Sequence, residues 1–223
     1  MSALTQLLPR LITIAVLAVL FMFLTVAISL GWLNASDHDV LNFMSGAWDE
    51  QLHPLFQGIA LLGGIELTSA LMIALAVYLY RSGLAADAWV LVAFAAAEVF
   101  ELFYKNNLTH PAPPPTVVHH DGPSITDLFA SATAAHNSFP SGHMMRTVLV
   151  FGLLAFVIRR LAPAGWPRTV AAPAAIAIVV LMAFDRLYLD VHWESDVLGG
   201  LLLGAIGLVS ATVWLDRPRR ADN

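Results

Sequence analysis

Long apolar runs, separated by short polar breaks, make up most of the chain. An α-helix needs about 20 mainly apolar residues to cross a bilayer. Six runs approach that length, at about 11–33, 55–80, 85–104, 141–158, 169–189 and 197–215. The breaks hold charged residues, Pro or Gly, as connections between helices do. The pattern therefore predicts an all-α, polytopic membrane protein with six transmembrane helices.

Two segments depart from this pattern. Between 37 and 54, acidic residues are mixed with large apolar ones, a composition typical of an amphipathic segment at the membrane interface. Between 105 and 140 the chain is polar and rich in Pro, and it is the longest stretch without an apolar run of spanning length. We expect this second segment to form a loop on the outer face of the membrane.

The composition agrees with a membrane protein and narrows its function. Of the 223 residues, 58% are hydrophobic and 12% are charged, whereas soluble domains carry about 25% charged residues. The length suits a single membrane-embedded domain over 1–223, with a motif-bearing core at about 101–215. The chain has no Cys, which excludes disulfides, thiol nucleophiles and Cys-bound metals. A net charge of −5 without a basic run gives no reason to expect nucleic-acid binding.

The positions of Lys and Arg predict the orientation, because cytoplasmic loops are rich in these residues. If the N-terminus is cytoplasmic, six spans place eight of the 11 Lys and Arg residues on that side. These eight are Arg10, Arg81, Arg159, Arg160, Arg168, Arg217, Arg219 and Arg220. We therefore expect both termini in the cytoplasm. Lys105, Arg146 and Arg186 then lie near the outer face, together with the His residues.

The stretch from Asp185 to Asp196 holds one Arg, one His and four carboxylates beside apolar runs. Charged side chains are costly at membrane depth and persist mainly where they pair or act. If a helix begins near Trp193, Asp196 shares a face with His192, four positions earlier. The carboxylate then holds the imidazole by one ring nitrogen and leaves the other to attack a substrate or accept a proton. The alternative is a juxtamembrane loop whose polar residues face water.

A second polar motif, Phe139-Pro140-Ser141-Gly142-His143, opens the fourth apolar run. Pro followed by Ser-Gly is typical of a helix start, where unpaired backbone N–H groups bind anions. Gly142 lets a phosphate approach the backbone closely, and His143 is placed to donate a proton to a leaving oxygen. The alternative is an ordinary helix cap with a surface His.

Lys105 lies at the end of the third apolar run, four residues after Glu101. It is a candidate phosphate ligand. The same position also suits a lysine that extends its ammonium group to the membrane surface, or an ordinary helical ion pair with Glu101. The sequence leaves these alternatives open.

Together, these three stretches resemble the motifs of the type-2 phosphatidic acid phosphatase superfamily, membrane lipid phosphatases related to glucose-6-phosphatase. The segment 140–143 matches one family motif fully, and Arg186, His192 and Asp196 match another with its spacing intact. The resemblance implies that His192 is a nucleophile that forms a phosphohistidine, which water then hydrolyses. It also implies that Asp196 orients His192 and that His143 protonates the leaving oxygen.

The resemblance further implies the ligands, the substrate class and the location. Lys105, Ser141, Gly142 and Arg186 would hold the phosphoryl oxygens, with neither a metal ion nor a cofactor. A site beside hydrocarbon favours a lipid phosphomonoester or diphosphate, with undecaprenyl diphosphate first and phosphatidic acid or phosphatidylglycerol phosphate next. The expected location is the inner (plasma) membrane, as a multi-pass protein with its active site facing the periplasm or exterior.

The sequence departs from the family pattern at three positions. Ala112 stands where the family has Arg before Pro, and His110 stands where many members have a further Arg. Asp185 replaces the Ser before Arg186. Because a guanidinium matches phosphate geometry, its loss puts the usual activity in doubt. The departures keep open a non-hydrolytic lipid-phosphate binding protein or a lipid phosphotransferase.

Several residues are candidates to compensate for the missing guanidinium. Arg146 lies one turn past His143, where a membrane-embedded Arg needs a partner. That partner is either the bound phosphate or a carboxylate, Asp185 or Glu98. His110, when protonated, is a weaker candidate for a phosphate donor.

The adjacent histidine pair at 119–120 raises a separate question. It either faces solvent or binds a metal ion.

Overall fold

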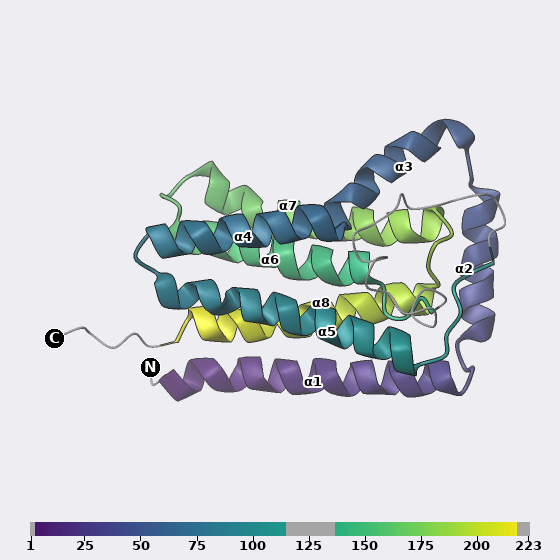
Figure 1. Ribbon diagram of the computed structural model, residues 1–223, viewed down its shortest axis with the longest axis horizontal. Helices are drawn as coiled ribbons and strands as arrows, with labels where there is room; N and C mark the ends of the chain where they lie inside the picture. The colour runs from purple at the N-terminus through teal and green to yellow at the C-terminus, as the bar shows by residue number, and fades with distance from the viewer. Residues whose placement is uncertain (1–2, 115–136, 218–223) are drawn as a thin grey trace.

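The computed structural model describes residues 3–114 and 137–217. Its long helices lie side by side in an elongated bundle, and α2 crosses one end of that bundle (Figure 1). The α-helices are α1 (Ala3–Ser29), α2 (Asn34–Gly46), α3 (His53–Ala60), α4 (Ile65–Arg81), α5 (Val90–Asn107), α6 (Gly142–Leu161), α7 (Trp166–Tyr188) and α8 (Glu194–Leu215). Within the described ranges no strand forms, so the all-α prediction is confirmed there.

Four helical segments are long and apolar enough to cross a bilayer. They are Leu7–Ser29, Glu50–Arg81, Trp166–Tyr188 and Glu194–Leu215. The helices α5 and α6 cover the other two predicted runs but are not among these segments. Both helices carry buried charged residues, Glu101 and Arg146. Each predicted run is mostly helical, whereas the total of six spans and the cytoplasmic position of the termini remain predictions.

The first predicted run, 11–33, is wrong at both ends. The helix α1 begins at Ala3 and ends at Ser29. Gly31 adopts a φ of +70°, the left-handed conformation that glycine favours after a helix. The Gly31 N–H donates to the Ile28 carbonyl and the Trp32 N–H to the Ala27 carbonyl, both at 2.9 Å. These bonds close the helix four residues before the predicted end.

The second predicted run, 55–80, is interrupted and not one continuous helix. It consists of α3, a 3-10 turn at Leu61–Gly63, and α4. Gly64 has extended backbone angles, φ −61° and ψ 146°, so the helical hydrogen bonding stops there. The interruption leaves the Gly63 carbonyl available to accept a hydrogen bond from Arg146 of α6.

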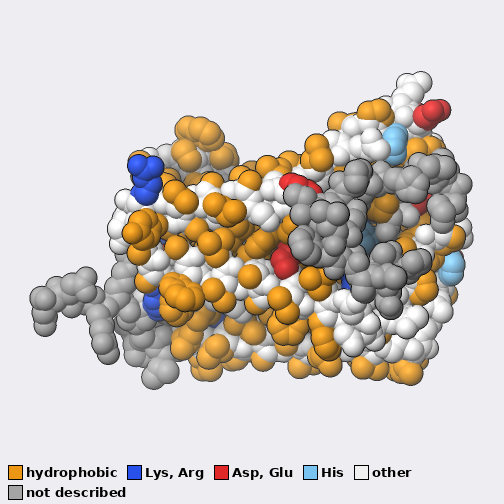
Figure 2. All heavy atoms as spheres, viewed as in Figure 1, with side chains coloured by type: hydrophobic (Ala, Val, Ile, Leu, Met, Phe, Trp, Pro, Cys, Tyr) orange, Lys and Arg blue, Asp and Glu red, His pale blue; other side chains and the backbone are white. Residues whose placement is uncertain are grey.

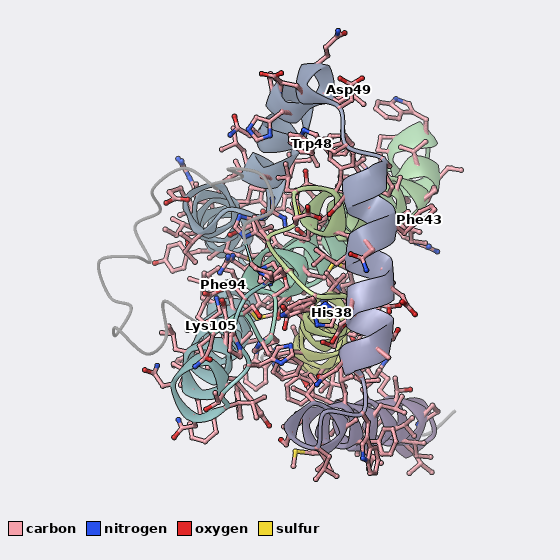
Figure 3. All side chains as sticks on the ribbon, turned by 90° about the vertical axis from the view of Figure 1, so that its right-hand side faces the viewer. His38, Phe43, Trp48, Asp49, Phe94 and Lys105 are labelled. Atoms are coloured by element: carbon pink, nitrogen blue, oxygen red, sulfur yellow. The ribbon has the colours of Figure 1, made fainter. Side chains whose placement is uncertain are left out.

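The predicted interfacial segment, 37–54, contains α2 and the start of α3. Figure 3 shows α2 lying across the end of the bundle. Its Leu41 and Met44 are buried, whereas Phe43 on the other side is 75% exposed. The helix is therefore amphipathic, with one face packed on the bundle end and another turned outward.

The helix α6 lies at the centre of the bundle, packed against α7 and α8, while α1 covers α8. Its side chains Met145, Leu149 and Leu153 are fully buried. The outer flanks of the bundle, in contrast, display hydrophobic side chains over most of the visible face (Figure 2). Phe23 and Ile176 are more than half exposed. A continuous exposed apolar surface of this kind suits contact with lipid.

One end of the bundle gathers basic residues in ion pairs. Arg10 pairs with Asp216 at 2.6 Å, and Asp87 accepts both Arg160 at 3.4 Å and Arg217 at 3.0 Å. In Figure 1 the start of α1 and the end of α8 lie at this end, whereas the starts of α6 and α8, where the motif residues are, lie toward the opposite end. The cytoplasmic position of this end remains a prediction, and the clustering of its basic residues agrees with it.

Candidate active site

His192 and Asp196 contact each other at the start of α8. Trp193 precedes the first residue of the helix, as predicted, so the two side chains lie four positions apart. The His192 Nδ1 is 3.3 Å from the Asp196 Oδ2, which also accepts the Trp193 backbone N–H at 2.9 Å. Asp196 is fully buried and His192 is 9% exposed. Within the described part of the chain nothing bonds the His192 Nε2, which leaves that nitrogen for chemistry.

The motif at 139–143 forms the start of α6, as predicted. Ser141 precedes the helix, and its Oγ accepts the Met144 N–H at 3.5 Å. The Ser141 N–H, which we expected to be open to an anion, instead donates to the Asp196 carbonyl at 3.0 Å. The N–H groups of Gly142 and His143 have no acceptor among the described residues. These two groups are therefore the ones available to an anion.

Arg186 lies in the last turn of α7, fully buried beside Asp185. Its Nε and Nη2 both donate to the Asp185 Oδ2, at 2.9 and 2.5 Å. The guanidinium is thus bound by the carboxylate of the preceding residue, at the position where the family pattern has Ser. A phosphate at this site would have to share Arg186 with Asp185.

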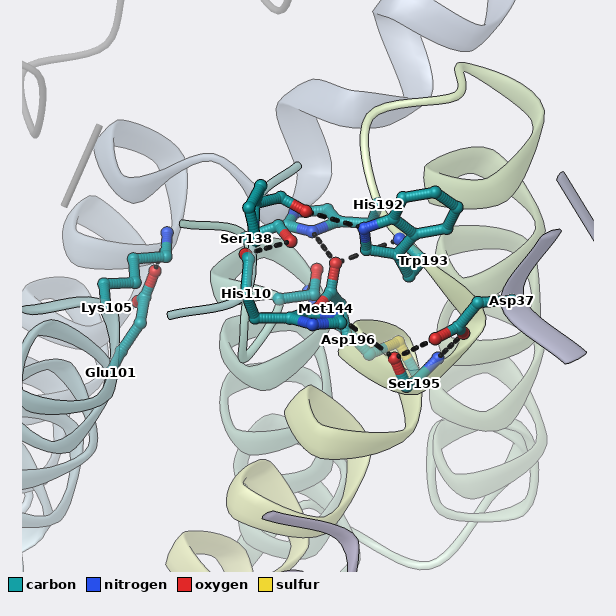
Figure 4. Close-up of polar contacts among 12 residues, drawn as sticks. Asp37, Glu101, Lys105, His110, Ser138, Met144, His192, Trp193, Ser195 and Asp196 are labelled. Carbon is teal, nitrogen blue, oxygen red and sulfur yellow. Dashed lines mark hydrogen bonds and ion pairs between the residues drawn. The ribbon is translucent and has the colours of Figure 1, made fainter. Parts of the chain in front are cut away.

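Lys105 forms a helical ion pair with Glu101, one of the alternatives that the sequence leaves open. The Lys105 Nζ lies 2.7 Å from the Glu101 Oε1, and Figure 4 shows the pair at the edge of the site. The ammonium group is partly exposed, whereas the carboxylate is buried. A phosphate ligand role for Lys105 remains a prediction.

Arg146 of α6 is buried next to the Lys105–Glu101 pair. Its Nη1 contacts the Glu98 Oε2 at 3.2 Å and the Glu101 Oε2 at 3.1 Å, and its Nε donates to the Gly63 carbonyl at 2.8 Å. The predicted pairing with Glu98 is confirmed. The alternative pairing with Asp185 is wrong, because that carboxylate is bound to the arginine next to it in the chain.

Glu101 therefore joins Lys105 to Arg146, and Gly142 leaves room for it. A Cβ atom at position 142 would lie 2.1 Å from the Glu101 Oε1. Any larger residue would displace this carboxylate. The sequence predicts close approach of a phosphate to Gly142, whereas in the structure the close contact is to the Glu101 carboxylate of the protein itself.

A contact from α2 also reaches the start of α8. Asp37 accepts the Ser195 N–H at 2.9 Å and the Ser195 hydroxyl at 2.8 Å. Burial raises the pKa of the Asp37 carboxyl, although the hydrogen bonds from Ser195 oppose this shift. The contact ties the amphipathic helix to the residue directly before Asp196.

A model of the PAP2 superfamily matches residues 86–220, more than half of the chain and all three motif stretches. The chain belongs to the PAP2 superfamily. The predicted family resemblance is thereby confirmed.

Two curated PAP2 relatives are similar in sequence. Over 141 residues, the chain is 35% identical to "Putative undecaprenyl-diphosphatase YbjG" of Escherichia coli (strain K12), covering 62% of this chain and 64% of that protein. Over 70 residues, it is 39% identical to "Phosphatidylglycerophosphatase B" of Bacillus subtilis (strain 168), covering 31% of this chain and 34% of that protein. Each match spans less than two thirds of the relative's length.

The fold is similar to a solved PAP2 structure, described as "Crystal structure of the first transmembrane PAP2 type phosphatidylglycerolphosphate phosphatase from Bacillus subtilis". The TM-score is 0.79, and the match covers 93% of this chain and 98% of that one. The sequences are only 21% identical, so this likeness concerns the fold. The chain therefore has a PAP2 fold, and its four apolar helical segments of spanning length are those of an integral membrane protein.

The cations of this PAP2 site already have carboxylate partners. Lys105 is paired with Glu101 and Arg186 with Asp185, while Arg146 contacts Glu101 and a second glutamate. Pairing reduces the cost of burying these charges. It also means that an incoming phosphate would replace or share existing ion pairs.

The first family motif is incomplete in this PAP2 chain. Ala112 is exposed and carries no hydrogen-bonding side chain. The backbone around it is nonetheless fixed, because the Trp193 Nε1 donates to the Pro111 carbonyl at 2.7 Å. The histidine pair at 119–120 and His136 lie outside the described residues. Among the described residues, no group of three or more His, Cys, Asp or Glu side chains could hold a metal ion.

Three residues of the site were not selected from the sequence. Glu101 was considered only as a helical partner of Lys105, Asp37 only as part of an amphipathic segment, and His110 only as a weak phosphate donor. One signal was available for Glu101, because an acid one turn before a motif lysine lies on the same helix face. The partners of the other two lie on distant segments, so no local spacing could show them.

Proposed function

We propose that this PAP2 protein hydrolyses the phosphate or diphosphate group of a membrane lipid, with His192 as the nucleophile. The observation that carries the proposal is the contact between His192 Nδ1 and Asp196, joined to the start of α6 by the bond from Ser141. This arrangement supports a nucleophilic imidazole beside a helix start that binds anions.

In the proposed reaction, the His192 Nε2 attacks phosphorus and the bond to the leaving oxygen breaks. Asp196 holds the Nδ1–H and stabilises the positive charge that develops on the ring. His143 donates a proton to the leaving oxygen. Water then attacks the phosphorus of the phosphohistidine, while His143, now neutral, accepts a proton from that water. The P–N bond breaks, which releases inorganic phosphate and restores the free imidazole of His192. This sequence uses no metal ion or cofactor.

The phosphoryl oxygens are proposed to contact Lys105, Arg186 and the helix start at Ser141 and Gly142. Such donors act where negative charge is held in the transition state. Arg146 is a more distant candidate. Its contacts to two glutamates make it a support for Lys105 through Glu101, unless phosphate binding rearranges the pairs.

We place undecaprenyl diphosphate first among the substrates, because the relative with the longer match carries that activity in its name. Phosphatidylglycerol phosphate and phosphatidic acid follow. The proposed location is the inner (plasma) membrane with the site on the periplasmic or outer face. The basic residues at the opposite end of the bundle support this orientation.

The test is release of inorganic phosphate from undecaprenyl diphosphate in detergent with EDTA present. We compare the wild type with His192→Ala and with His53→Ala, a histidine of α3 outside the proposed machinery. The proposal is supported if the wild type and His53→Ala release phosphate and His192→Ala does not. It is also supported if a phosphorylated form of the protein can be trapped in the wild type but not in His192→Ala. Absence of release from this and the other lipid phosphates would favour the binding or phosphotransferase alternative.

A further inference from the structure

Asp196 lies between two histidines. Its Oδ2 contacts the His192 Nδ1, and its Oδ1 lies 3.3 Å from the Nε2 of His110 (Figure 4). The Oδ1 atom is buried and receives no well-aligned hydrogen bond from the described residues. Since a buried carboxylate oxygen is costly without a donor, the imidazole of His110 is the group positioned to satisfy it.

The backbone of His110 is held in place by the opposite side of the loop. Its N–H donates to the Asn137 Oδ1 at 3.0 Å, and its carbonyl accepts the Ser138 N–H at 2.9 Å. The imidazole lies close to the rings of Phe139 and Trp193. The side chain is therefore packed against the motif segments and is not directed into solvent.

The neighbouring hydroxyl indicates which atom of His110 carries a proton. The Ser195 Oγ donates its hydrogen to the Asp37 Oδ2 at 2.8 Å, and the same Oγ lies 3.4 Å from the His110 Nε2. A hydroxyl has one hydrogen, so it offers His110 only a lone pair. Asp196 is also an acceptor. Because both atoms near the His110 Nε2, the Ser195 Oγ and the Asp196 Oδ1, are acceptors, the Nε2 carries the hydrogen and donates it.

We propose that His110 is a positioning residue for the His192–Asp196 pair. Its Nε2–H holds one oxygen of Asp196 and thereby keeps the other oxygen on the His192 Nδ1. The proposal rests on the proposed function. It reassigns His110 from the phosphate, where the sequence suggested it, to the carboxylate behind the nucleophile.

A neutral His110 donates a hydrogen bond without cancelling the negative charge of Asp196. A doubly protonated His110 would add a positive charge next to that carboxylate and weaken its support of the charge that develops on His192. The titratable groups around His110 are Asp196 and, beyond it, His192, with Asp37 behind Ser195.

The experiment compares His110→Phe, which removes the donor, with His110→Gln, whose amide nitrogen can replace Nε2–H. We expect His110→Phe to lower kcat for phosphate release by about 10- to 100-fold, with KM nearly unchanged. His110→Gln retains most of the activity, because its amide nitrogen still donates to Asp196. His38→Phe, an exposed histidine on α2, is the control.

The wild type and His192→Ala are measured in the same assay, so failure of the proposed function is seen separately as wild-type inactivity. For an active wild type, three results would overturn the role of His110. They are an unchanged kcat in His110→Phe, an increase in KM alone, or a His110→Gln variant as impaired in kcat as His110→Phe. If His110→Phe does not fold, the kcat of His110→Gln decides: a value near that of the wild type supports the role, and a loss of about 10-fold or more in a folded variant overturns it.

Discussion

The backbone N–H of Ser141 donates to the backbone carbonyl of Asp196 at 3.0 Å. This one bond joins the start of α6 to the start of α8, although the two residues are far apart in the chain. The proposed acid, His143, and the proposed nucleophile, His192, are thereby attached to one rigid junction. The bond uses only main-chain atoms, so neither side chain takes part in it.

We predict that Asp196→Asn lowers kcat by on the order of 10³-fold or more, because an amide cannot stabilise positive charge on His192. The side chain keeps its size and still accepts the Trp193 N–H, so the fold is retained. The measurement is phosphate release at neutral pH. Glu194→Gln, two residues earlier on the same helix, is the matched control and retains activity. Equal activity of Asp196→Asn and wild type would contradict the role of Asp196.

For Arg146→Met we predict a loss of about 3 kcal/mol of stability, because the buried Glu101 keeps only Lys105 as a cationic partner and the partly buried Glu98 loses its contact with Arg146. The measurement is thermal unfolding in detergent. Arg146→Met combined with Glu101→Gln removes one charge of each sign and recovers part of the loss, as a double-mutant cycle can show. Unchanged stability together with a weaker inhibition by phosphate would instead indicate that Arg146 binds the substrate.

Replacement of Asp185 by Ser restores the family residue and removes the partner of Arg186. We expect Asp185→Ser to unfold at a lower temperature without ligand, since a buried guanidinium is left without its carboxylate. Added phosphate stabilises this variant more than the wild type, because the ligand binds the released guanidinium. Asp216→Ser removes the partner of Arg10 at the opposite end and is the control. An equal response to phosphate in all three proteins would refute the assignment of Arg186.

The raised pKa of Asp37 predicts a pH dependence of stability. Between the ordinary carboxyl value, about 3.9, and the raised value, the folded protein binds more protons than the unfolded chain does. Stability therefore falls as pH rises through this window and stays at the lower level above it. Asp37→Asn, which does not titrate, shows a flatter profile. Asp39→Asn, an exposed carboxylate of the same helix, keeps the wild-type slope; identical slopes in all three would contradict the prediction.

The sequence predicted what depends on short spacing. The helical runs follow from the hydrophobic pattern within one segment. The pairs His192–Asp196 and Lys105–Glu101 follow from a spacing of four residues, and both are found. The end of α1 was misplaced because apolar residues continue past Gly31, whose backbone conformation is what stops the helix. Hydrophobicity does not report that conformation.

Contacts between distant segments could not be predicted from spacing or hydrophobicity. Asp37 reaches Ser195, and His110 reaches Asp196, only because α2 and the base of the long loop fold over the start of α8. The choice of Glu98 over Asp185 as a partner of Arg146 likewise depends on which helix lies beside α6. Spacing within one segment carries no information on these choices.

The ion pairs of the site have a consequence for ligand choice. A phosphate that enters exchanges with the carboxylates of Glu101 and Asp185 for the same cations, so its affinity is the difference between two sets of ion pairs. A ligand with one negative charge gains little from such an exchange, whereas a diphosphate, with more charge and more oxygens, can outcompete both carboxylates. The Glu101 and Asp185 carboxylates would then select ligands by charge, because only a ligand with enough negative charge displaces them. This selection would favour terminal diphosphates over singly charged lipid headgroups.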